Sequence, residues 1–205
     1  MYMPVTLILG GDETSAKPIA KRFYSSGSAV VLAGGDSATL ADTHKDLYDS
    51  GWIKPILHPR RDSESGAWSA EQAMEEFLGV SRIISLASCE VVANDSKAKG
   101  LPPEVGGVLS DILDEACAAA SRAESGCPIV VVVSIPQDCR GDETGFRQKV
   151  RDRLRDERKR RRLELVARNC ELHLLVWDSS YGLSDLEDLT RLVFGLCSAG
   201  KALVT

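Results

Sequence analysis

A pair of glycines near the start of the chain stands where a phosphate-binding loop would lie. In the stretch TLILGGDETSAKPIAKRF, from Thr6 to Phe23, apolar residues lead into Gly10 and Gly11, and a helical pattern follows. A glycine turn at the amino end of a helix can bind phosphate, because backbone N–H groups and the helix dipole both favour an anion there. Whether this loop can hold a dinucleotide depends on the side chains that follow the glycines.

Those side chains add charge and stiffness to the loop. Asp12 and Glu13 place two carboxylates beside the helix amino terminus, where they favour the helix and would repel a phosphate. Thr14 is β-branched, so it restricts the loop and takes up space that a phosphate would need. We therefore expect a turn that binds no ligand, and the alternative is a loop that still binds a dinucleotide weakly.

The remaining reactive side chains are scattered. The six cysteines include no C-x-x-C pair, and His44, His58 and His173 are not at ligand spacing, so we expect reduced thiols and no metal site. The 205 residues are 43% hydrophobic with a net charge of -5, which suits one domain spanning 1–205 and disfavours general nucleic-acid binding. No apolar run approaches the roughly 20 residues that cross a bilayer. The amino terminus also lacks a basic leader, so we expect a cytoplasmic protein without membrane contact.

Strands and helices that alternate along the chain must position these residues. The expected strands are 5–9, 29–33, 53–57, 82–86, 129–133 and 172–177, with a last short one at 202–204. The expected helices are one that ends at Gly27, then 37–49, 69–78, 108–123, 142–168 and 184–196, with a loop at 94–107. Continuously apolar strands indicate a sheet that is buried on both faces. The predicted fold class is therefore α/β: a Rossmann-like, doubly wound, mostly parallel sheet of six to seven strands with helices on both faces.

The order of these elements, and the phrases LILGG, IAKRF and GSAVVLAGGD, resemble the short-chain dehydrogenase/reductase family along nearly the whole chain. The cofactor loop of that family reads T-G-x-x-x-G-x-G. Here only the first glycine of the pattern is kept, since Thr14 and Ala16 replace the other two. The resemblance thus implies a degenerate loop that binds neither NAD nor NADP, consisting of Gly10, Gly11, Asp12, Glu13, Thr14 and Ala16.

The family's cofactor selector and catalytic residues are also altered. Gly34 and Gly35 stand where the family selects the cofactor ribose, and Asp36 is predicted to cap the next helix. The family uses a Tyr-x-x-x-Lys pair in which lysine lowers the pKa of tyrosine, and no tyrosine of this chain has lysine four residues later. The matching positions are Ser134 for the family's serine, Phe146 or Arg147 for its tyrosine, and Val150 or Arg151 for its lysine. The resemblance therefore implies no catalytic residues and a chain that is inactive on its own.

The helices expected at 108–123 and 142–168 match the pair that dimerises in the family. The first has an alanine-rich face and the second an apolar stripe, and the predicted interface residues are Ile112, Ala116, Ala119, Ala120, Phe146, Val150 and Leu154. Ten basic residues stand against three acidic ones between Arg147 and Arg162, a net charge of +7. Such a helix is a solvated face, a nucleic-acid site or a contact for an acidic partner. The absence of interleaved aromatic residues disfavours nucleic acid, and a different, acidic subunit avoids the repulsion of self-pairing.

These patterns favour a catalytically inactive subunit that pairs with an active homologous reductase in a heterotetrameric dehydrogenase or ketoreductase. The resemblance implies that NAD or NADP binds only in the partner, and mixed assemblies of the family include ones that act on acyl-CoA or carrier-protein thioesters. A stand-alone homodimeric binding or regulatory protein of Rossmann fold is the alternative. An enzyme with relocated chemistry would need an acid, base or nucleophile that the sequence does not reveal.

Overall fold

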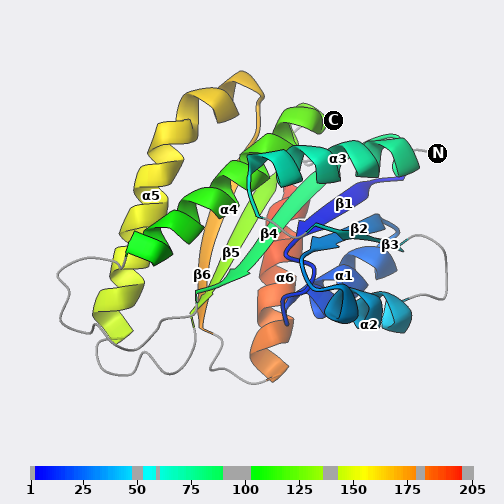
Figure 1. The fold of residues 1–205 in the computed structure, drawn as a ribbon, viewed down its shortest axis with the longest axis horizontal. Coiled ribbons are helices and arrows are strands. Elements are labelled where there is room, and N and C mark those ends of the chain that lie inside the picture. Colours follow the sequence, from blue (N-terminus) through cyan, green and yellow to red (C-terminus); the bar gives the residue numbers. More distant parts are fainter. Residues whose placement is uncertain are drawn as a thin grey trace.

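Six parallel strands form a single sheet in the order β3-β2-β1-β4-β5-β6 (Figure 1). The computed structural model describes residues 3–47, 53–58, 61–89, 103–135, 143–178 and 183–199. The strands are β1 (Val5–Leu9), β2 (Ala29–Gly34), β3 (Ile53–Leu57), β4 (Arg82–Ser88), β5 (Ile129–Ile135) and β6 (Leu172–Asp178). Each neighbouring pair is parallel. The predicted α/β fold class is confirmed, and the reversal of strand order between β1 and β4 is the one found in dinucleotide-binding folds.

Helices cover both faces of this sheet (Figure 1). In the described part of the chain they are α1 (Ala16–Ser25), α2 (Ser37–Leu47), α3 (Ser63–Phe77), α4 (Pro103–Arg122), α5 (Glu143–Ala167) and α6 (Leu183–Ala199). Helices α3, α4 and α5 pack on one face, and α1, α2 and α6 pack on the other. None of these helices combines the length and the apolar character that crossing a bilayer requires.

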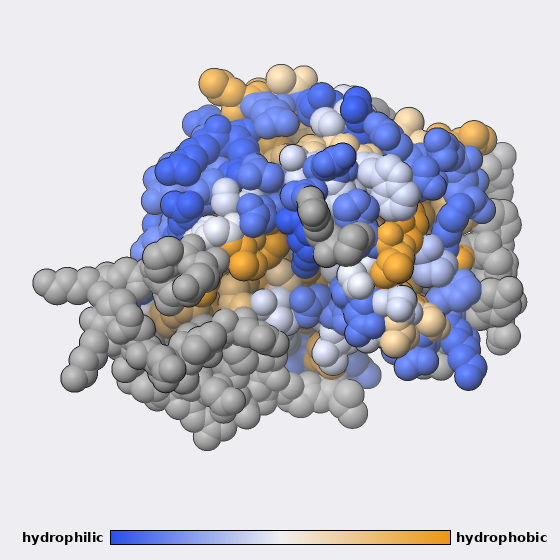
Figure 2. All heavy atoms as spheres, in the orientation of Figure 1, coloured by the Kyte–Doolittle hydropathy of each residue, from blue (hydrophilic) through white to orange (hydrophobic). Residues whose placement is uncertain are grey.

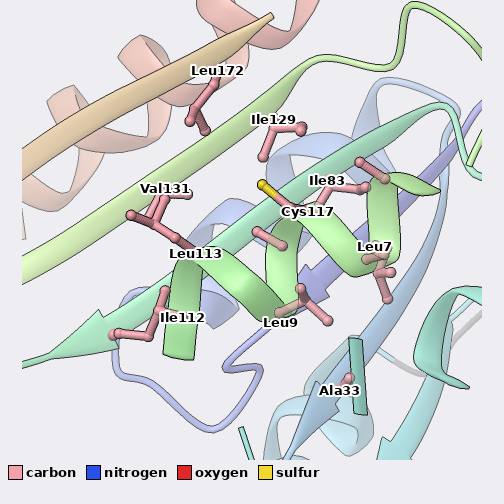
Figure 3. Close-up of a cluster of buried hydrophobic side chains, with 14 of the residues drawn as sticks. Leu7, Leu9, Ala33, Ile83, Ile112, Leu113, Cys117, Ile129, Val131 and Leu172 are labelled. Carbon is pink, nitrogen blue, oxygen red and sulfur yellow. The ribbon is translucent and has the colours of Figure 1, made fainter. Parts of the chain in front are cut away.

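The core under α4 shows why these strands lie in the middle of the molecule. Every residue of β1 and β2 is buried, and all of them except Thr6 are apolar, as expected for strands covered on both faces. Figure 3 shows Leu7, Ile83 and Ile129 of three neighbouring strands beside side chains of α4. Burying each large side chain stabilises the fold by roughly 1.5–3 kcal/mol.

Helix α3 begins at Ser63, six residues before the predicted start at Ser69. Asp62 caps it, because its Oδ1 accepts from the backbone N–H of Ser65 at 2.9 Å, and Ser65 Oγ accepts from the N–H of Asp62 at 2.9 Å. The early turns also bring α3 very close to α4. A Cβ atom on Gly66 would lie 2.0 Å from the carbonyl oxygen of Glu115, so only glycine fits there.

Helix α4 also begins earlier than predicted. Residues 103–107 are helical and were expected to be the end of a loop. Pro103 is compatible with this start, since proline suits the first turn of a helix, where its missing N–H has no intrahelical partner. The rest of that predicted loop, 94–102, and the predicted last strand, 202–204, lie outside the described residues.

Candidate functional site at the carboxyl ends of β1 and β4

The crevice at the carboxyl ends of β1 and β4 is where folds of this class bind ligands. Gly10 turns the chain there with φ 74°, a left-handed conformation that glycine adopts without strain. A Cβ atom on Gly10 would lie 2.2 Å from the carbonyl oxygen of Leu86 and 2.9 Å from Nη1 of Arg61. The glycine turn is therefore pressed against β4 and covered by an arginine of the same chain.

Asp12 ties the glycine turn to the end of β2. Its Oδ2 accepts hydrogen bonds from the backbone N–H groups of Gly35 and Asp36, both at 2.9 Å. Its Oδ1 lies 2.5 Å from where a Cβ atom on Gly34 would be, so the carboxylate fills the space beside that glycine. The end of β2 is where folds of this class hold the cofactor ribose, and here it binds a carboxylate of the chain itself.

Glu13 ties the same turn to the end of β4. Its Oε1 accepts from the backbone N–H of Ser88 at 3.0 Å, and its Oε2 accepts from Ser88 Oγ at 2.6 Å. The predicted role of Asp12 and Glu13 was to favour the amino terminus of α1. In the structure these carboxylates bridge strand ends instead, because the turn points them across the sheet edge and away from the helix.

Arg61 closes the crevice from the side of α3 and α4. Its Nε and Nη2 donate to Glu115 Oε2 at 3.0 and 2.8 Å, Nη2 also donates to Ser85 Oγ at 3.1 Å, and Nη1 donates to the carbonyl oxygen of Leu86. The side chain of Glu115 is only 5% exposed. Burial raises the pKa of Glu115, and the adjacent Arg61 opposes that rise by favouring the carboxylate. The guanidinium thus joins β4 to α4 directly above Gly10.

The other loop residues do not crowd the crevice. The side chain of Thr14 is exposed, whereas Ala16 is fully buried in the first turn of α1. The crowding that was expected from Thr14 comes from Arg61 and the two carboxylates, because those side chains reach across the strand ends.

The predicted cap at Asp36 is confirmed. Its Oδ1 accepts from the N–H of Ala38 at 2.9 Å, and its Oδ2 accepts from Thr39 Oγ1 at 3.0 Å. These bonds, that from Ala38 above all, lower the pKa of Asp36 because they stabilise the carboxylate.

The positions that match the family's catalytic residues lie on β5 and on α5. Ser134 lies beside Ser88 in the β4–β5 register. Phe146 is half-buried against the hydrophobic core, and Val150 is fully buried in it. None of the side chains at Phe146, Arg147, Val150 and Arg151 donates a proton at neutral pH, since two are apolar and the others are guanidinium groups that stay charged. In the described ranges no three Asp, Glu, His or Cys side chains are grouped as metal ligands.

The predicted interface residues lie inside the chain. Six of them are at most 2% exposed, namely Ile112, Ala116, Ala119, Ala120, Val150 and Leu154, and Phe146 is half-buried. They belong to a buried cluster that also contains Ala70 and Ala73 of α3, so the helix that packs near the alanines of α4 is α3 of the same chain. This corrects the prediction of an apolar stripe that awaits a partner. A partner that binds α4 and α5 has to use their outer faces.

Sequence reasoning missed Arg61, Ser88 and Glu115. Glu115 did carry a signal, because it lies on the buried face of α4 beside Leu113 and Ala116, and a buried carboxylate needs a cation or hydrogen-bond donors. Nothing local identifies Arg61 as its partner, since the two residues are 54 positions apart.

The fold is shared with solved short-chain dehydrogenase/reductase structures. A short-chain dehydrogenase/reductase from Serratia marcescens superposes with a TM-score of 0.71 at 13% identity, covering 96% of this chain and 91% of the other. A dehydrogenase/reductase from Sinorhizobium meliloti gives 0.71 at 17% identity, covering 100% and 92%. A short-chain dehydrogenase from Oenococcus oeni gives 0.69 at 15%, covering 97% and 91%. No protein-family model and no curated protein matches the sequence.

Proposed function

We propose that this chain is a catalytically inactive protein of the short-chain dehydrogenase/reductase fold, which serves as the non-catalytic subunit of a hetero-oligomeric dehydrogenase or ketoreductase. One observation carries the proposal: Asp12, Glu13 and Arg61 bind groups of their own chain across the crevice. A dinucleotide would have to displace these contacts. Displacing Arg61 would leave the carboxylate of Glu115, which is 5% exposed, without its cation, and a buried polar group without a partner costs about 1–3 kcal/mol, so displacement opposes binding.

The charge of the crevice supports the same proposal. Among the described residues, Asp12, Glu13 and Glu115 contribute three carboxylates beside the guanidinium of Arg61, and Arg61 already donates to Glu115. A pyrophosphate that enters the crevice meets negative charge at the place where its own negative charge needs N–H donors. The N–H groups of Gly35, Asp36 and Ser88 already bind carboxylates.

The partner surface in this proposal is the outer side of α4 and α5. Three large apolar side chains are exposed there: Val108 at 43%, Leu163 at 84% and Val166 at 67%. Leu163 and Val166 are three residues apart on one helix, so they lie side by side. Covering them with an apolar surface of another subunit is favourable, and the basic residues around them favour an acidic partner over a second copy.

The first test concerns the crevice. Titration calorimetry of the purified chain with NADH and NADPH should give no binding at physiological concentrations, with an NADPH-dependent reductase of known affinity as the positive control. Micromolar binding of NADH or NADPH to the isolated chain would contradict the proposal of an inactive subunit and would favour an enzyme.

The second test concerns the partner. The chain is co-expressed with each reductase of its own genome that keeps the glycine loop and the Tyr-x-x-x-Lys pair, and the complexes are weighed by native mass spectrometry. We expect a mixed tetramer that reduces a carbonyl substrate at a rate unchanged by Ser134→Ala in this chain. Leu163→Asp should weaken that tetramer. A stable homodimer that forms a complex with none of these reductases would instead support the alternative of a stand-alone regulatory protein.

A further inference from the structure

We infer that a hollow between α5 and β6 receives an aliphatic side chain of the partner subunit, which is flanked by carboxylates on its own chain. The hollow has a volume of about 260 Å³ and is lined by Arg151, Leu154, Arg155, Arg158, Leu174 and Val176. The inference rests on the proposed function, since it names the chemistry by which that subunit would be recognised.

The floor of the hollow is apolar and continuous with the core. Leu154 is 2% exposed, and Leu174 and Val176 are half-buried side chains packed against the same hydrophobic cluster. Leu174 and Val176 are two positions apart in β6, so they point to the same face of the strand. β6 ends the sheet in the described part of the chain, and no described strand lies beyond it to cover this face.

The rim of the hollow is made of three guanidinium groups from one face of α5. Arg151, Arg155 and Arg158 are spaced at i, i+4 and i+7, so they stand above one another along the helix. Within the described residues, Arg151 and Arg158 make no ion pair, and Arg155 meets Asp152 in an exposed pair at 3.3 Å. Figure 2 shows a mostly hydrophilic surface along α5.

The arginines on the other side of α5 differ from these three. Glu157, which is 1% exposed, binds Arg153 at 2.9 Å and Arg160 at 3.0 Å. Arg161 also binds Glu157, and its Nε donates to Asp114 Oδ1 of α4 at 3.2 Å. Two carboxylates, Glu157 and Asp114, therefore offset most of the positive charge toward α4, whereas the three arginines at the hollow meet only Asp152, which leaves a surplus of positive charge there. Guanidinium groups bind carboxylates through two parallel hydrogen bonds, so the surplus fits acidic side chains.

The size of the hollow favours a protein segment over a free metabolite. Small-molecule sites usually have volumes of about 300–1,000 Å³, and this hollow is smaller. It suits one or two aliphatic side chains, because the floor is formed by leucine and valine. Nucleic acid fits less well, since the described residues that line the hollow include no aromatic side chain to stack on a base.

The inference can be tested on the full chain with a labelled synthetic peptide. The probe has a central leucine between two pairs of glutamates, and its control has serine in place of the leucine. Fluorescence anisotropy should show that the leucine peptide binds, and that Arg151→Glu/Arg158→Glu weakens it about tenfold or more through lost charge pairing. Val176→Thr, which keeps the size of the side chain, should weaken the leucine peptide alone.

The matched control is Lys21→Glu/Lys45→Glu, which changes the net charge equally but at exposed positions of α1 and α2, on the other face of the sheet. It should leave the affinity within about threefold, because rim charges outside the contact act mainly through long-range attraction. Equal losses in both double variants, or equal binding of the serine peptide, would overturn the inference. It would also be overturned if a DNA duplex of about 20 base pairs displaced the peptide, since that would indicate a phosphate-binding surface.

The same experiment separates this inference from the proposed function. If the chain forms the mixed tetramer but does not bind the peptide, the hollow is not the recognition site and the proposed function stands. If the peptide binds while the isolated chain also binds NADPH, the hollow stands and the inactive-subunit proposal fails.

Discussion

Two charged regions of this molecule differ in whether their charged side chains bind groups of the same chain. At the carboxyl ends of β1 and β4, Asp12, Glu13 and Arg61 each bind groups of the same chain. Along α5 the basic side chains outnumber the acidic ones, and those at the hollow, such as Arg151 and Arg158, are exposed. The charged groups of the first region therefore have partners within the chain, whereas the guanidinium groups of the second present exposed donors.

The largest effect is expected where α5 faces the core. Val150→Asp buries an unpaired carboxylate among apolar side chains, so we expect it to destabilise the chain by about 3 kcal/mol or more. Arg151→Asp, at the neighbouring exposed position, should change stability by only about 0.5 kcal/mol. Urea denaturation followed by circular dichroism measures both. If Val150→Asp were as stable as the original chain but no longer bound a partner subunit, Val150 would belong to the interface, as the sequence predicted.

A smaller but still large effect is expected when the crevice is opened. Arg61→Met leaves Glu115 buried without its cation, which should cost about 3 kcal/mol in urea denaturation. The double variant Arg61→Met/Glu115→Met removes both charges and should recover most of that loss, because apolar pairs often replace buried ion pairs at little cost. Additive losses in the double variant would show that Arg61 and Glu115 do not act as a pair.

The link between the glycine turn and β2 should matter less, because it lies near solvent. Asp12→Ala removes the acceptor for two backbone N–H groups and should cost about 1 kcal/mol. Asp42→Ala on the exposed face of α2 is the control and should stay within about 0.5 kcal/mol.

Restoring the glycines alone should not reopen this crevice. Thr14→Gly/Ala16→Gly should still bind no NADPH in calorimetry unless Asp12 and Glu13 are also neutralised, because the carboxylates repel the phosphates. Binding by the glycine variant alone would mean that loop shape, rather than charge, closes the site.

The smallest effects concern the dependence of stability on pH. The contributions of one glutamate on α5 and one on α4 should change with pH in opposite directions. Burial raises the pKa of Glu157, but Arg161, Arg153 and Arg160 outweigh it and the pKa is lowered. Its contribution to stability is therefore present above the usual pKa of a glutamate and is lost as pH falls through the lowered value. Burial raises the pKa of Glu115, so its contribution is present below the usual pKa and is lost as pH rises through the raised value.

Two amide variants measure these contributions. Relative to the original chain, Glu157→Gln should lose less stability as the solution is acidified, and Glu115→Gln should lose less as pH rises from acid toward neutral. Thermal denaturation from pH 3 to 7 provides the test, with Glu75→Gln on the exposed face of α3 as the control. Slopes of the same sign for Glu115 and Glu157 would contradict the contrast between the two sites.

Much of the fold was determined by the sequence alone. Apolar runs predicted the central strands, since a segment buried on both faces must be apolar throughout, and β1 was predicted with its observed bounds. The bounds of β3, which is only partly buried, were predicted as well. The cap at Asp36 also followed from local chemistry. The starts of α3 and α4 were missed, because Gly66 and residues 103–107 are weak local helix signals that tertiary packing outweighs.

The contacts made by the glycine turn and by the apolar stripe of α5 were decided by tertiary structure. The sequence shows that Asp12 and Glu13 are negative, but not that they bind Gly35 and Ser88, which are distant in the chain. It shows a stripe at Val150 and Leu154, but not that the stripe faces its own sheet. Hydrophobic periodicity is a local property and can be read from neighbouring residues. The partner of a charge, or the occupant of an apolar face, depends on which distant segments meet, and only the folded chain determines that.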